Sequence, residues 1–295
     1  MFLITGAAGK TGKAILRKLT EKGQLIKALV FRFDQVSEVE VLGAKEVIVG
    51  DMRNLEIVRR ALQGVDSIYH ICPNVHPDEI TIGQSLIDAA AKVGIEHFVY
   101  HSVLHPHIEA MPHHWKKMRV EEFLFESGLP YTILQPAIYM QNILVNWENI
   151  IMLGQYTVPY SVESRLSMVD LEDVARAART ILMDGSDEGN HHAGATYELV
   201  GTPAISQTEI AALLSEHLNC PVFAESVSID YWIRNIRPSN MGDYQTDTLV
   251  KMFDYYNKYG LSGNSNVLSY LLNGPTTKFD AFVKRVINDK LRYVQ

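Results

Sequence analysis

The segment Thr5-Gly6-Ala7-Ala8-Gly9-Lys10-Thr11-Gly12 is the most informative stretch of this sequence. Its glycines follow the pattern Gly-x-x-Gly-x-x-Gly, directly after an apolar run and directly before a helical pattern. In that position Gly6 allows a tight turn, Gly9 lets the backbone approach a pyrophosphate, and Gly12 lets the helix pack closely on the strand. Amides at the start of the helix would hold the phosphate oxygens. The predicted cofactor-binding residues of this loop are Gly6, Ala8, Gly9, Lys10, Thr11 and Gly12.

The first 136 residues alternate short apolar runs with amphipathic helical patterns. This alternation is typical of βαβ units and of a parallel sheet. Six strands with intervening helices fit an α/β fold, the Rossmann-type doubly wound parallel sheet that binds dinucleotides. The predicted strands are Phe2–Thr5, Ile26–Phe31, Glu46–Asp51, Ser67–Cys72, His97–Val103 and Pro130–Pro136.

The alternation of apolar runs and helical patterns ends after the sixth predicted strand. Ala137–Met152 reads as a helix, and a second helix ends at Met183 with Asp170 as its predicted N-cap. A seventh strand is predicted at Tyr197–Val200, and the last 65 residues look helical. We therefore expect an NAD(P)-binding domain at residues 1–152, to which the helix Asp170–Met183 and the last strands return. Residues 153–295 would form a smaller, mostly helical C-terminal subdomain that covers the substrate.

Composition places the chain among ordinary globular proteins. Of its 295 residues, 47% are hydrophobic and 21% are charged, which excludes disorder, and no apolar run approaches the ~18 residues of a membrane span. The formal net charge of −7 argues against a nucleic-acid surface. The two cysteines, Cys72 and Cys220, stand in unlike contexts, which fits a reducing compartment and no metal site. We expect a cytoplasmic protein with neither nucleic acid nor a membrane as partner.

The end of the second predicted strand distinguishes the two nicotinamide cofactors. An NAD-binding protein carries an acid about 20 residues after the loop, where it binds the ribose diol. Here that position holds Arg32, and Asp34 lies too far along the chain. A guanidinium suits the 2′-phosphate of NADP through bidentate contacts, and Lys10 could add charge. NADP(H) is the preferred cofactor and NAD(H) the alternative; the competing interpretation of Arg32 is a solvated surface residue.

Two further segments fall at the same edge of the predicted sheet. Gly50-Asp51-Met52-Arg53 ends the third strand, where Asp51 and Met52 can frame the adenine. Ile71-Cys72-Pro73 ends the fourth strand, at the crevice where the strand order reverses. We interpret Cys72 as a packing residue beside the cofactor rather than a nucleophile, because the sequence indicates no acid or base partner for it.

Several segments outside the glycine loop carry a family resemblance. They are Gly50-Asp51-Met52-Arg53, Lys117-Met118-Arg119-Val120-Glu121-Glu122, Ser127-Gly128-Leu129-Pro130-Tyr131-Thr132-Ile133-Leu134-Gln135-Pro136, Tyr139-Met140-Gln141-Asn142, Val169-Asp170 and Tyr259–Asn264. Together they resemble the NmrA-like family, an atypical branch of the short-chain dehydrogenase/reductases, over essentially the whole chain. The resemblance implies NADP(H) binding in a quinone reductase, an isoflavone-reductase-like enzyme or a non-catalytic NADP sensor. The sequence departs from its relatives at Gln135 and Phe31, where many carry Arg.

The catalytic tyrosine of that superfamily is missing. None of the 14 tyrosines is followed by a lysine four residues later, and His113 takes the position before Lys117. His113 could relay a proton or be a surface histidine in a loop. Lys117 could hydrogen-bond the nicotinamide ribose, or act as the general acid or base, as the resemblance to isoflavone-reductase-like enzymes implies. Its structural alternative is an exposed pair with Glu121.

Four other residues complete the predicted site. Ser102 matches the superfamily position that faces the substrate oxygen, or is a simple strand-end serine. Trp115, Tyr139 and Asn142 could line an acceptor pocket with flat walls, or belong to the core. We expect an NADPH-dependent reductase that passes hydride to a quinone or conjugated carbonyl, as a monomer or homodimer. The alternative is a non-catalytic redox sensor that regulates a protein partner.

Overall fold

The computed structural model describes residues 1–184, 190–238 and 240–292. The chain divides into two compact units. The first comprises Met1–Glu109, His113–Pro136 and Val174–Glu198, and the second Ala110–Pro112, Ala137–Asp173 and Leu199–Gln295. The sequence predicts a boundary at residue 152, whereas in the structure the first unit ends at Pro136 and the second continues from Ala137. The reason is that Ile138 and Tyr139 pair with a strand of the second unit at Met168 and Val169.

The first unit contains the large sheet. Its elements are β1 (Phe2–Thr5), α1 (Lys10–Thr20), β2 (Ile26–Val30), η1 (Phe33–Gln35), α2 (Val36–Glu40), β3 (Glu46–Val49), α3 (Leu55–Leu62), β4 (Ser67–His70), α4 (Glu79–Val93), β5 (His97–His101), α5 (Pro112–Glu126), β6 (Tyr131–Pro136), most of α7 (Leu171–Met183) and β10 (Ala195–Leu199). Within the described residues the sheet has seven strands, ordered β10-β6-β5-β4-β1-β2-β3. Strands β1 to β6 pair in parallel. The order reverses between β1 and β4, which confirms the predicted doubly wound Rossmann-type fold.

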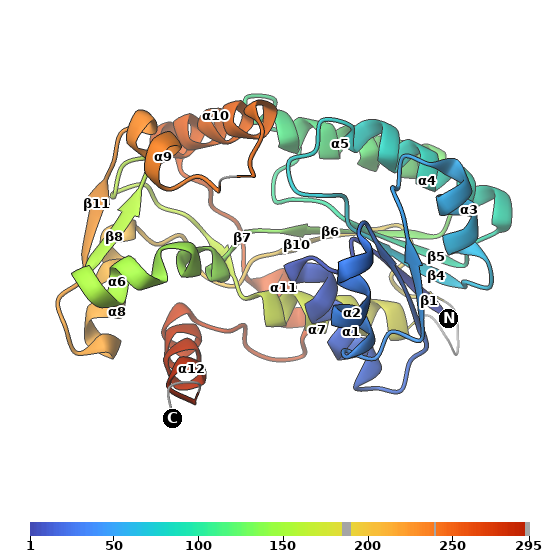
Figure 1. The fold of residues 1–295 in the computed structure, drawn as a ribbon, viewed down its shortest axis with the longest axis horizontal. Coiled ribbons are helices and arrows are strands. Elements are labelled where there is room, and N and C mark those ends of the chain that lie inside the picture. The colour runs from blue at the N-terminus through green and yellow to red at the C-terminus, as the bar shows by residue number, and fades with distance from the viewer. Residues whose placement is uncertain (185–189, 239, 293–295) are drawn as a thin grey trace. The chain divides into compact units, whose positions relative to one another are not determined.

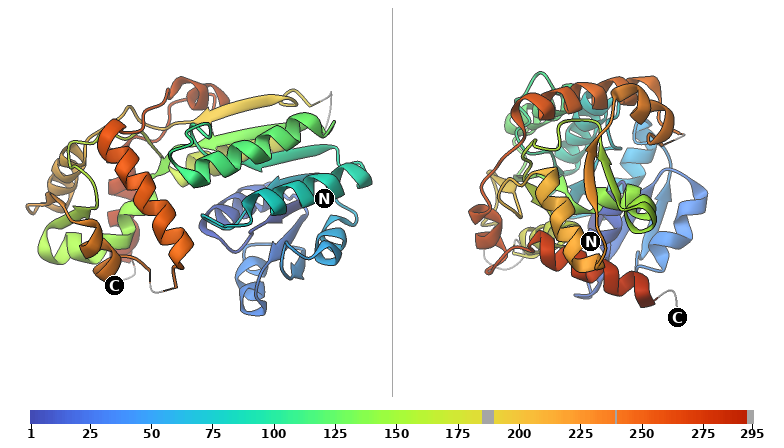
Figure 2. Two further views of the ribbon diagram at one scale, coloured as in Figure 1. Left: turned by 90° about the horizontal axis from the view of Figure 1, so that it is seen from above. Right: turned by 90° about the vertical axis from the view of Figure 1, so that its left-hand side faces the viewer.

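Helices cover both faces of this sheet. In Figure 1, α3, α4 and α5 lie on one face, and α1, α2 and α7 on the other. A Cβ added to Gly83 of α4 would lie 2.6 Å from the Cγ1 atom of Val120, so α4 and α5 pack closely side by side (Figure 2, left). Because all these parallel strands run the same way, their carboxyl ends at Thr5, Val30 and His70 meet at one edge. The cofactor is predicted to bind at that edge.

The second unit is mostly helical, as predicted. It consists of β7 (Ile138–Tyr139), η2 (Met140–Asn146), α6 (Trp147–Leu153), β8 (Gln155–Val158), β9 (Met168–Val169), α8 (Gln207–Leu218), β11 (Phe223–Ser226), α9 (Ile229–Asn235), α10 (Asp243–Tyr259), α11 (Asn266–Leu271) and α12 (Phe279–Arg292). Strands β8 and β11 lie side by side in parallel (Figure 2, right). The hydrophobic core of this unit contains large side chains, among them Trp147, Ile150, Ile210 and Phe282.

The prediction of one helix over Ala137–Met152 was wrong. The segment begins as strand β7, continues as the 3-10 helix η2, and becomes α-helical only at Trp147. Backbone pairing of β7 with β9 prevents helical geometry at its start. The predicted N-cap of α7 is confirmed, because Asp170 Oδ1 accepts a hydrogen bond of 3.1 Å from the backbone amide of Glu172.

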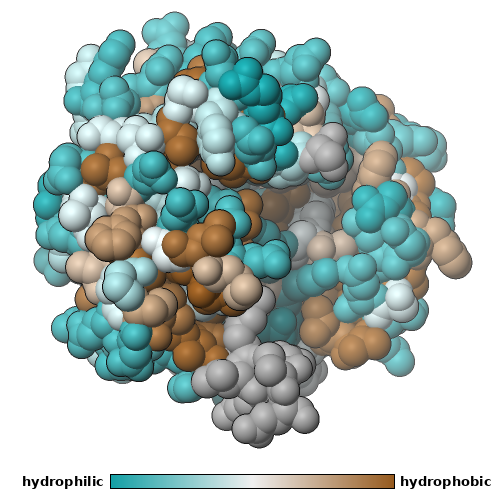
Figure 3. Space-filling model, turned by 60° about the vertical axis from the view of Figure 1, so that its left-hand side comes forward, coloured by the Kyte–Doolittle hydropathy of each residue, from teal (hydrophilic) through white to brown (hydrophobic). Residues whose placement is uncertain are grey.

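Hydrophobic side chains reach the surface in patches among hydrophilic ones (Figure 3). In the second unit the exposed apolar residues include Met152, Leu153, Phe223 and Tyr270. In the part of the chain that the structure describes, no helix combines the length and apolarity needed to cross a membrane.

Candidate cofactor and active site

Two glycines of the loop between β1 and α1 are required by the fold itself. Gly6 has φ +59°, and an added Cβ would lie 2.8 Å from the carbonyl oxygen of Ile71. A Cβ on Gly12 would lie 2.5 Å from the carbonyl oxygen of Gly6, because α1 packs directly on the turn. These contacts agree with the turn and packing roles that the sequence predicted for Gly6 and Gly12.

Gly9 has no such structural requirement. It is exposed, and its φ of −73° and ψ of 165° are open to any residue. An added Cβ would meet only the Gly6 carbonyl oxygen, at 3.3 Å. Gly9 is the N-cap of α1 but has no side chain to cap the helix, and the first turn contains no acidic residue. A helix N-terminus without a capping side chain or a neighbouring carboxylate fits a dinucleotide phosphate, whose space a side chain at Gly9 would fill.

The end of β2 places Arg32 at the surface beside a carboxylate. The Arg32 Nε atom donates a hydrogen bond of 3.0 Å to Asp34 Oδ1, and both side chains are exposed. Phe31, the residue before Arg32, is also exposed. Asp34, set aside as too distant along the chain, therefore shares the Arg32 guanidinium. Binding of a 2′-phosphate by Arg32 stays a prediction. It requires the Arg32 guanidinium either to break its hydrogen bonds to Asp34 or to bind Asp34 and the phosphate at the same time.

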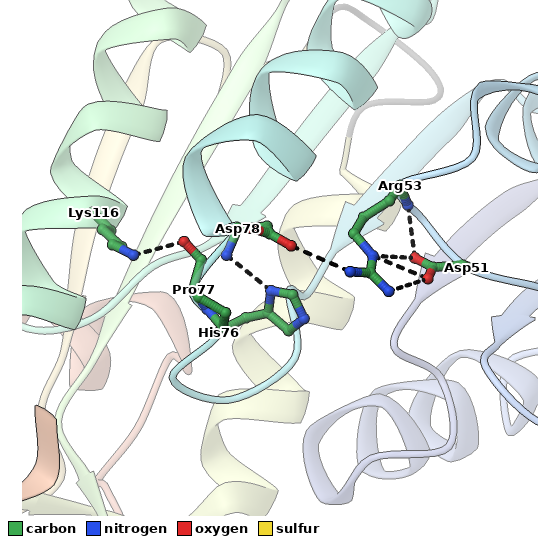
Figure 4. A network of polar contacts seen from close by, with 6 residues as sticks. All are labelled: Asp51, Arg53, His76, Pro77, Asp78 and Lys116. Carbon is green, nitrogen blue, oxygen red and sulfur yellow. Dashed lines mark hydrogen bonds and ion pairs between the residues drawn. The ribbon is translucent and has the colours of Figure 1, made fainter. Parts of the chain in front are cut away.

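At the end of β3, the predicted adenine-framing residue Asp51 is tied to Arg53. Arg53 Nη2 lies 2.6 Å from Asp51 Oδ2, and Arg53 Nη1 lies 3.4 Å from Asp78 Oδ2 (Figure 4). The hydrogen bonds from Arg53 hold the pKa of the Asp51 carboxyl below its usual range. Met52 is partly buried against the apolar cluster of the sheet. Arg53 thus connects the β3 end to the start of α4.

The loop that follows β4 is held from both sides. Besides the Arg53–Asp78 contact, Lys116 Nζ of α5 donates to the Pro77 carbonyl oxygen at 2.6 Å (Figure 4). The backbone amide of Asp78 donates to His76 Nδ1 at 3.0 Å. This loop begins with the predicted cofactor-binding residues Ile71, Cys72 and Pro73.

Those three residues differ in accessibility. Pro73 is exposed, Ile71 is half-buried with its carbonyl against Gly6, and Cys72 is buried. Burial and the neighbouring Glu79 carboxylate raise the pKa of the Cys72 thiol well above its usual value. The thiolate needed for nucleophilic attack is therefore disfavoured, which agrees with the packing interpretation of Cys72.

Lys117 is part of a buried ion pair on the face of the sheet that α4 and α5 cover. Its Nζ atom donates to Glu79 Oε1 at 2.9 Å and to the carbonyl oxygen of His101 at 3.2 Å. It also lies 5.3 Å from the centre of the Tyr100 ring, and the Tyr100 hydroxyl donates to Glu79 Oε1 at 2.8 Å. The structural alternative, an exposed pair of Lys117 with Glu121, does not hold, because Lys117 on α5 pairs with Glu79 of α4 instead.

This pairing limits what Lys117 can do. An ammonium has three N–H donors, and within the described residues Lys117 has two hydrogen-bond acceptors. One N–H therefore remains for a ligand beside the last residue of β5. Burial opposes ionisation of Glu79, but the charge of Lys117 and the hydrogen bonds from Lys117 and Tyr100 hold the Glu79 pKa below its ordinary value.

Two histidines beside this pair are neutral at pH 7. His70 Nδ1 lies 2.8 Å from the hydroxyl of Thr5, and burial lowers the His70 pKa to about 4. His101 Nδ1 lies 2.8 Å from the hydroxyl of Tyr69, and burial lowers the His101 pKa to about 3. Neither imidazole holds a proton that it could donate as a cation near neutral pH.

Two predicted catalytic residues have environments that the sequence did not indicate. The Ser102 hydroxyl donates to Glu121 Oε1, which also accepts a hydrogen bond of 3.0 Å from Gln135 Nε2. The loop predicted around His113 was wrong, because His113 lies in the first turn of α5. His113 is half-buried rather than exposed, and burial of its ring lowers its pKa to about 2. A proton relay through the His113 imidazolium is therefore disfavoured, and the roles of Ser102 and His113 stay predictions.

The predicted pocket residues divide between the two units. Trp115 is exposed on α5 of the first unit. In the second unit, Tyr139 is half-buried in β7 and Asn142 is exposed in η2. Their role as walls of an acceptor pocket stays a prediction. Among the described residues, no group of three or more His, Cys, Asp or Glu side chains is arranged to hold a metal ion.

Sequence reasoning missed Glu79, although the sequence contained a signal for it. Glu79 precedes Ile82 and Gly83 by three and four positions, so it falls on the buried stripe of α4 that continues through Leu86 and Ala90. A carboxylate on the apolar stripe of a helix requires a buried partner. That requirement could have drawn attention to Glu79, but not to Lys117 as its partner.

Comparisons with known proteins agree with this architecture. The sequence model of the NmrA-like family matches residues 1–283. The NAD(P)H azoreductase of Xenophilus azovorans is 27% identical over 96% of this chain and 97% of that protein. An NADPH-dependent quinone oxidoreductase of Escherichia coli, solved with NADPH, is 25% identical over 98% of this chain and all of that chain, with a TM-score of 0.83. The negative transcriptional regulator NmrA, solved with NADP, shares the fold over 98% of this chain and 96% of its own at 18% identity and a TM-score of 0.80.

Proposed function

The chain belongs to the NmrA-like family, as its sequence resemblance predicted, and from this premise we propose that it is an NADPH-dependent reductase of quinones or conjugated carbonyls. Two full-length relatives are named as an NAD(P)H azoreductase and a quinone oxidoreductase, and one was solved with NADPH. The observation that carries the proposal is the glycine loop, where Gly6 and Gly12 serve the fold and Gly9 is left for a ligand.

Residues of the first unit can hold NADP(H) at several points. The N-terminus of α1 and Gly9 would hold the diphosphate, and Arg32 would contact the 2′-phosphate. Lys117 would donate its remaining N–H to a hydroxyl of the nicotinamide ribose. When bound, NADPH supplies the hydride for the reduction.

The proton-donating groups of this chain favour an electron-poor acceptor. A ketone needs an acid to protonate its oxygen, and none of the 14 tyrosines stands four residues before a lysine. His70 and His101 are held neutral by burial, and Glu79 is held ionised by Lys117 and Tyr100. Reduction of a quinone produces a stabilised hydroquinone anion that water can protonate, so it does not require such an acid.

The acceptor is therefore a small molecule. We propose that the protein acts in the cytoplasm, as a monomer or a homodimer, without nucleic acid or a membrane as partner. We propose Trp115, Tyr139 and Asn142 as acceptor-pocket residues, and Ser102 as a residue that faces the substrate oxygen.

A second candidate function is a non-catalytic NADP(H) sensor that regulates a protein partner. The missing tyrosine favours it, because a sensor needs the cofactor site without the proton donor. In that case NADPH and NADP should bind with clearly different affinities, and no acceptor should be reduced.

The test is NADPH oxidation at 340 nm with a panel of quinones, conjugated enones and azo dyes. We expect turnover with at least one quinone, and the Gly9→Val variant serves as the matched control for cofactor-dependent activity. Titrations with NADPH and NADP, followed by fluorescence, run in parallel. Tight NADPH binding without oxidation by any acceptor would contradict the reductase and favour the sensor.

A further inference from the structure

Glu79 is a buried carboxylate to which neither the family motifs nor the proposed hydride transfer assigns a role. It is 3% exposed, at the first residue of α4. Burying a charge is costly unless an opposite charge and hydrogen bonds accompany it. Glu79 has both, from Lys117 of α5 and Tyr100 of β5.

The contacts around this pair fix the position of the Lys117 ammonium. Its side chain is 15% exposed, and its Nζ atom is held by two acceptors that belong to different elements, Glu79 Oε1 and the His101 carbonyl oxygen. The Tyr100 ring lies against it as well. Two fixed acceptors determine the direction of the third N–H, because the three donors of an ammonium are tetrahedrally arranged.

We propose that Glu79 is the positioning residue of the site, which orients the free N–H of Lys117 toward a hydroxyl of the nicotinamide ribose. This inference rests on the proposed function, since the reductase supplies the ligand. Glu79 does not touch the cofactor in this proposal; it acts through Lys117. A residue in such a role affects turnover more than cofactor affinity, because the diphosphate and the 2′-phosphate are held elsewhere.

A merely structural role for Glu79 predicts a different pattern. In that case Glu79→Gln would lower the stability of the α4–α5 contact and leave turnover of the folded enzyme unchanged. Gly83→Ala provides the matched control, because its Cβ would lie 2.6 Å from Val120 Cγ1 on the same two helices. It disturbs the packing of α4 on α5 without touching the ion pair.

The experiment measures kcat, the KM of the acceptor, the Kd of NADPH and the thermal midpoint for five proteins. They are the wild type, Glu79→Gln, Lys117→Ala, the double variant and Gly83→Ala. We expect kcat to fall at least ~10-fold in Glu79→Gln, with the Kd of NADPH changed less. The double variant should be no slower than Lys117→Ala, because the two residues act as one unit. Gly83→Ala should lower the thermal midpoint and keep kcat within about two-fold of the wild type.

Two outcomes would overturn the proposal. One is a folded Glu79→Gln with the kcat of the wild type, and the other is a double variant whose losses multiply. If Glu79→Gln fails to fold, Glu79→Asp, which keeps the negative charge, takes the place of Glu79→Gln in the double-mutant cycle. We then expect a partial loss of kcat. A wild type that binds NADPH but reduces no acceptor contradicts the proposed function instead. In that case the Kd of NADPH, measured for the wild type, the two single variants and the double variant, tests whether Glu79 acts through Lys117.

Discussion

Replacing Gly9 by valine separates cofactor binding from folding in this protein. The backbone of Gly9 has φ −73° and ψ 165°, which valine adopts readily, and its position is exposed. A Cβ would touch only the Gly6 carbonyl oxygen, at 3.3 Å. The two methyl groups would then occupy the space in front of the first amides of α1. We expect a folded protein that binds the dinucleotide much more weakly than the wild type does.

The magnitudes follow from these contacts. Valine is a poorer N-cap than glycine, at a cost of about 1 kcal/mol, which lowers the thermal midpoint by only a few degrees in a protein of this size. Each hydrogen bond between a backbone amide and a charged phosphate contributes about 1.5–3 kcal/mol. Loss of one such bond weakens binding roughly 10- to 150-fold, since 1.4 kcal/mol is tenfold. Binding therefore suffers far more than folding.

Gly12→Ala is the matched control for this comparison. Its Cβ would lie 2.5 Å from the Gly6 carbonyl oxygen and 2.6 Å from Ala7 Cα, so the backbone must shift. We expect a loss of at least about 1–3 kcal/mol of stability, as overpacking of a tight contact produces.

The assays are a fluorescence titration with NADPH and a thermal denaturation curve for each variant. The expected pattern is Gly9→Val with a nearly native midpoint and a much weaker Kd, and Gly12→Ala with a clearly lowered midpoint. A Gly9→Val protein with native affinity would refute the assignment of this loop to the diphosphate. A Gly9→Val protein whose thermal midpoint falls as much as that of Gly12→Ala would refute the claim that the fold does not require glycine at position 9.

Three further predictions concern the other residues of the site. Arg32→Ala should weaken NADPH by about 1.5–3 kcal/mol and leave NADH nearly unchanged; equal losses in parallel titrations would show that Arg32 does not contact the 2′-phosphate. Lys117→Ala should reduce turnover with any active acceptor at least ~10-fold, about 1.4 kcal/mol of barrier, with a smaller loss of NADPH affinity; a variant with native turnover would remove Lys117 from the site. Acid should destabilise the fold, because the His70 pKa of about 4 lies below its unfolded value of about 6.5, so the unfolded chain binds the extra proton. The stability that neutral His70 contributes is complete above pH 6.5 and is lost as the pH falls toward 4, which amounts to about 2 kcal/mol by pH 5. Urea unfolding at pH 7 and pH 5 should show this loss, and a His70→Asn variant with the same pH dependence as the wild type would contradict it.

Most of the first unit could be predicted from the order of its residues. Strand β1 has the predicted bounds, and the other predicted strands of the sheet differ from the structure only at their ends. Apolar periodicity decides these elements, because each depends on residues that are neighbours along the chain. The segment 137–152 could not be predicted in this way, since its β7 strand exists only through pairing with Met168 and Val169.

The candidate site also contains features that the sequence indicated and features that it did not. The sequence indicated the glycine loop and the edge of the sheet where strands end, but it indicated neither Glu79 as the partner of Lys117 nor the helix that contains His113. The Lys117–Glu79 pair joins residues 38 positions apart, and the Thr5–His70 contact joins residues 65 positions apart. No local pattern specifies such pairs, because each depends on which helix covers which strand.

By itself, then, the sequence determined the α/β fold, the glycine turn that starts α1, and the family. Only the tertiary structure decided that Glu79 holds Lys117, that Thr5 contacts His70 and that Glu121 accepts from Ser102. The physical reason is that backbone conformation responds to residues a few positions away, within one turn or one strand. The ionic partner of a buried side chain is selected by packing and desolvation between distant segments, which come together only in the folded chain.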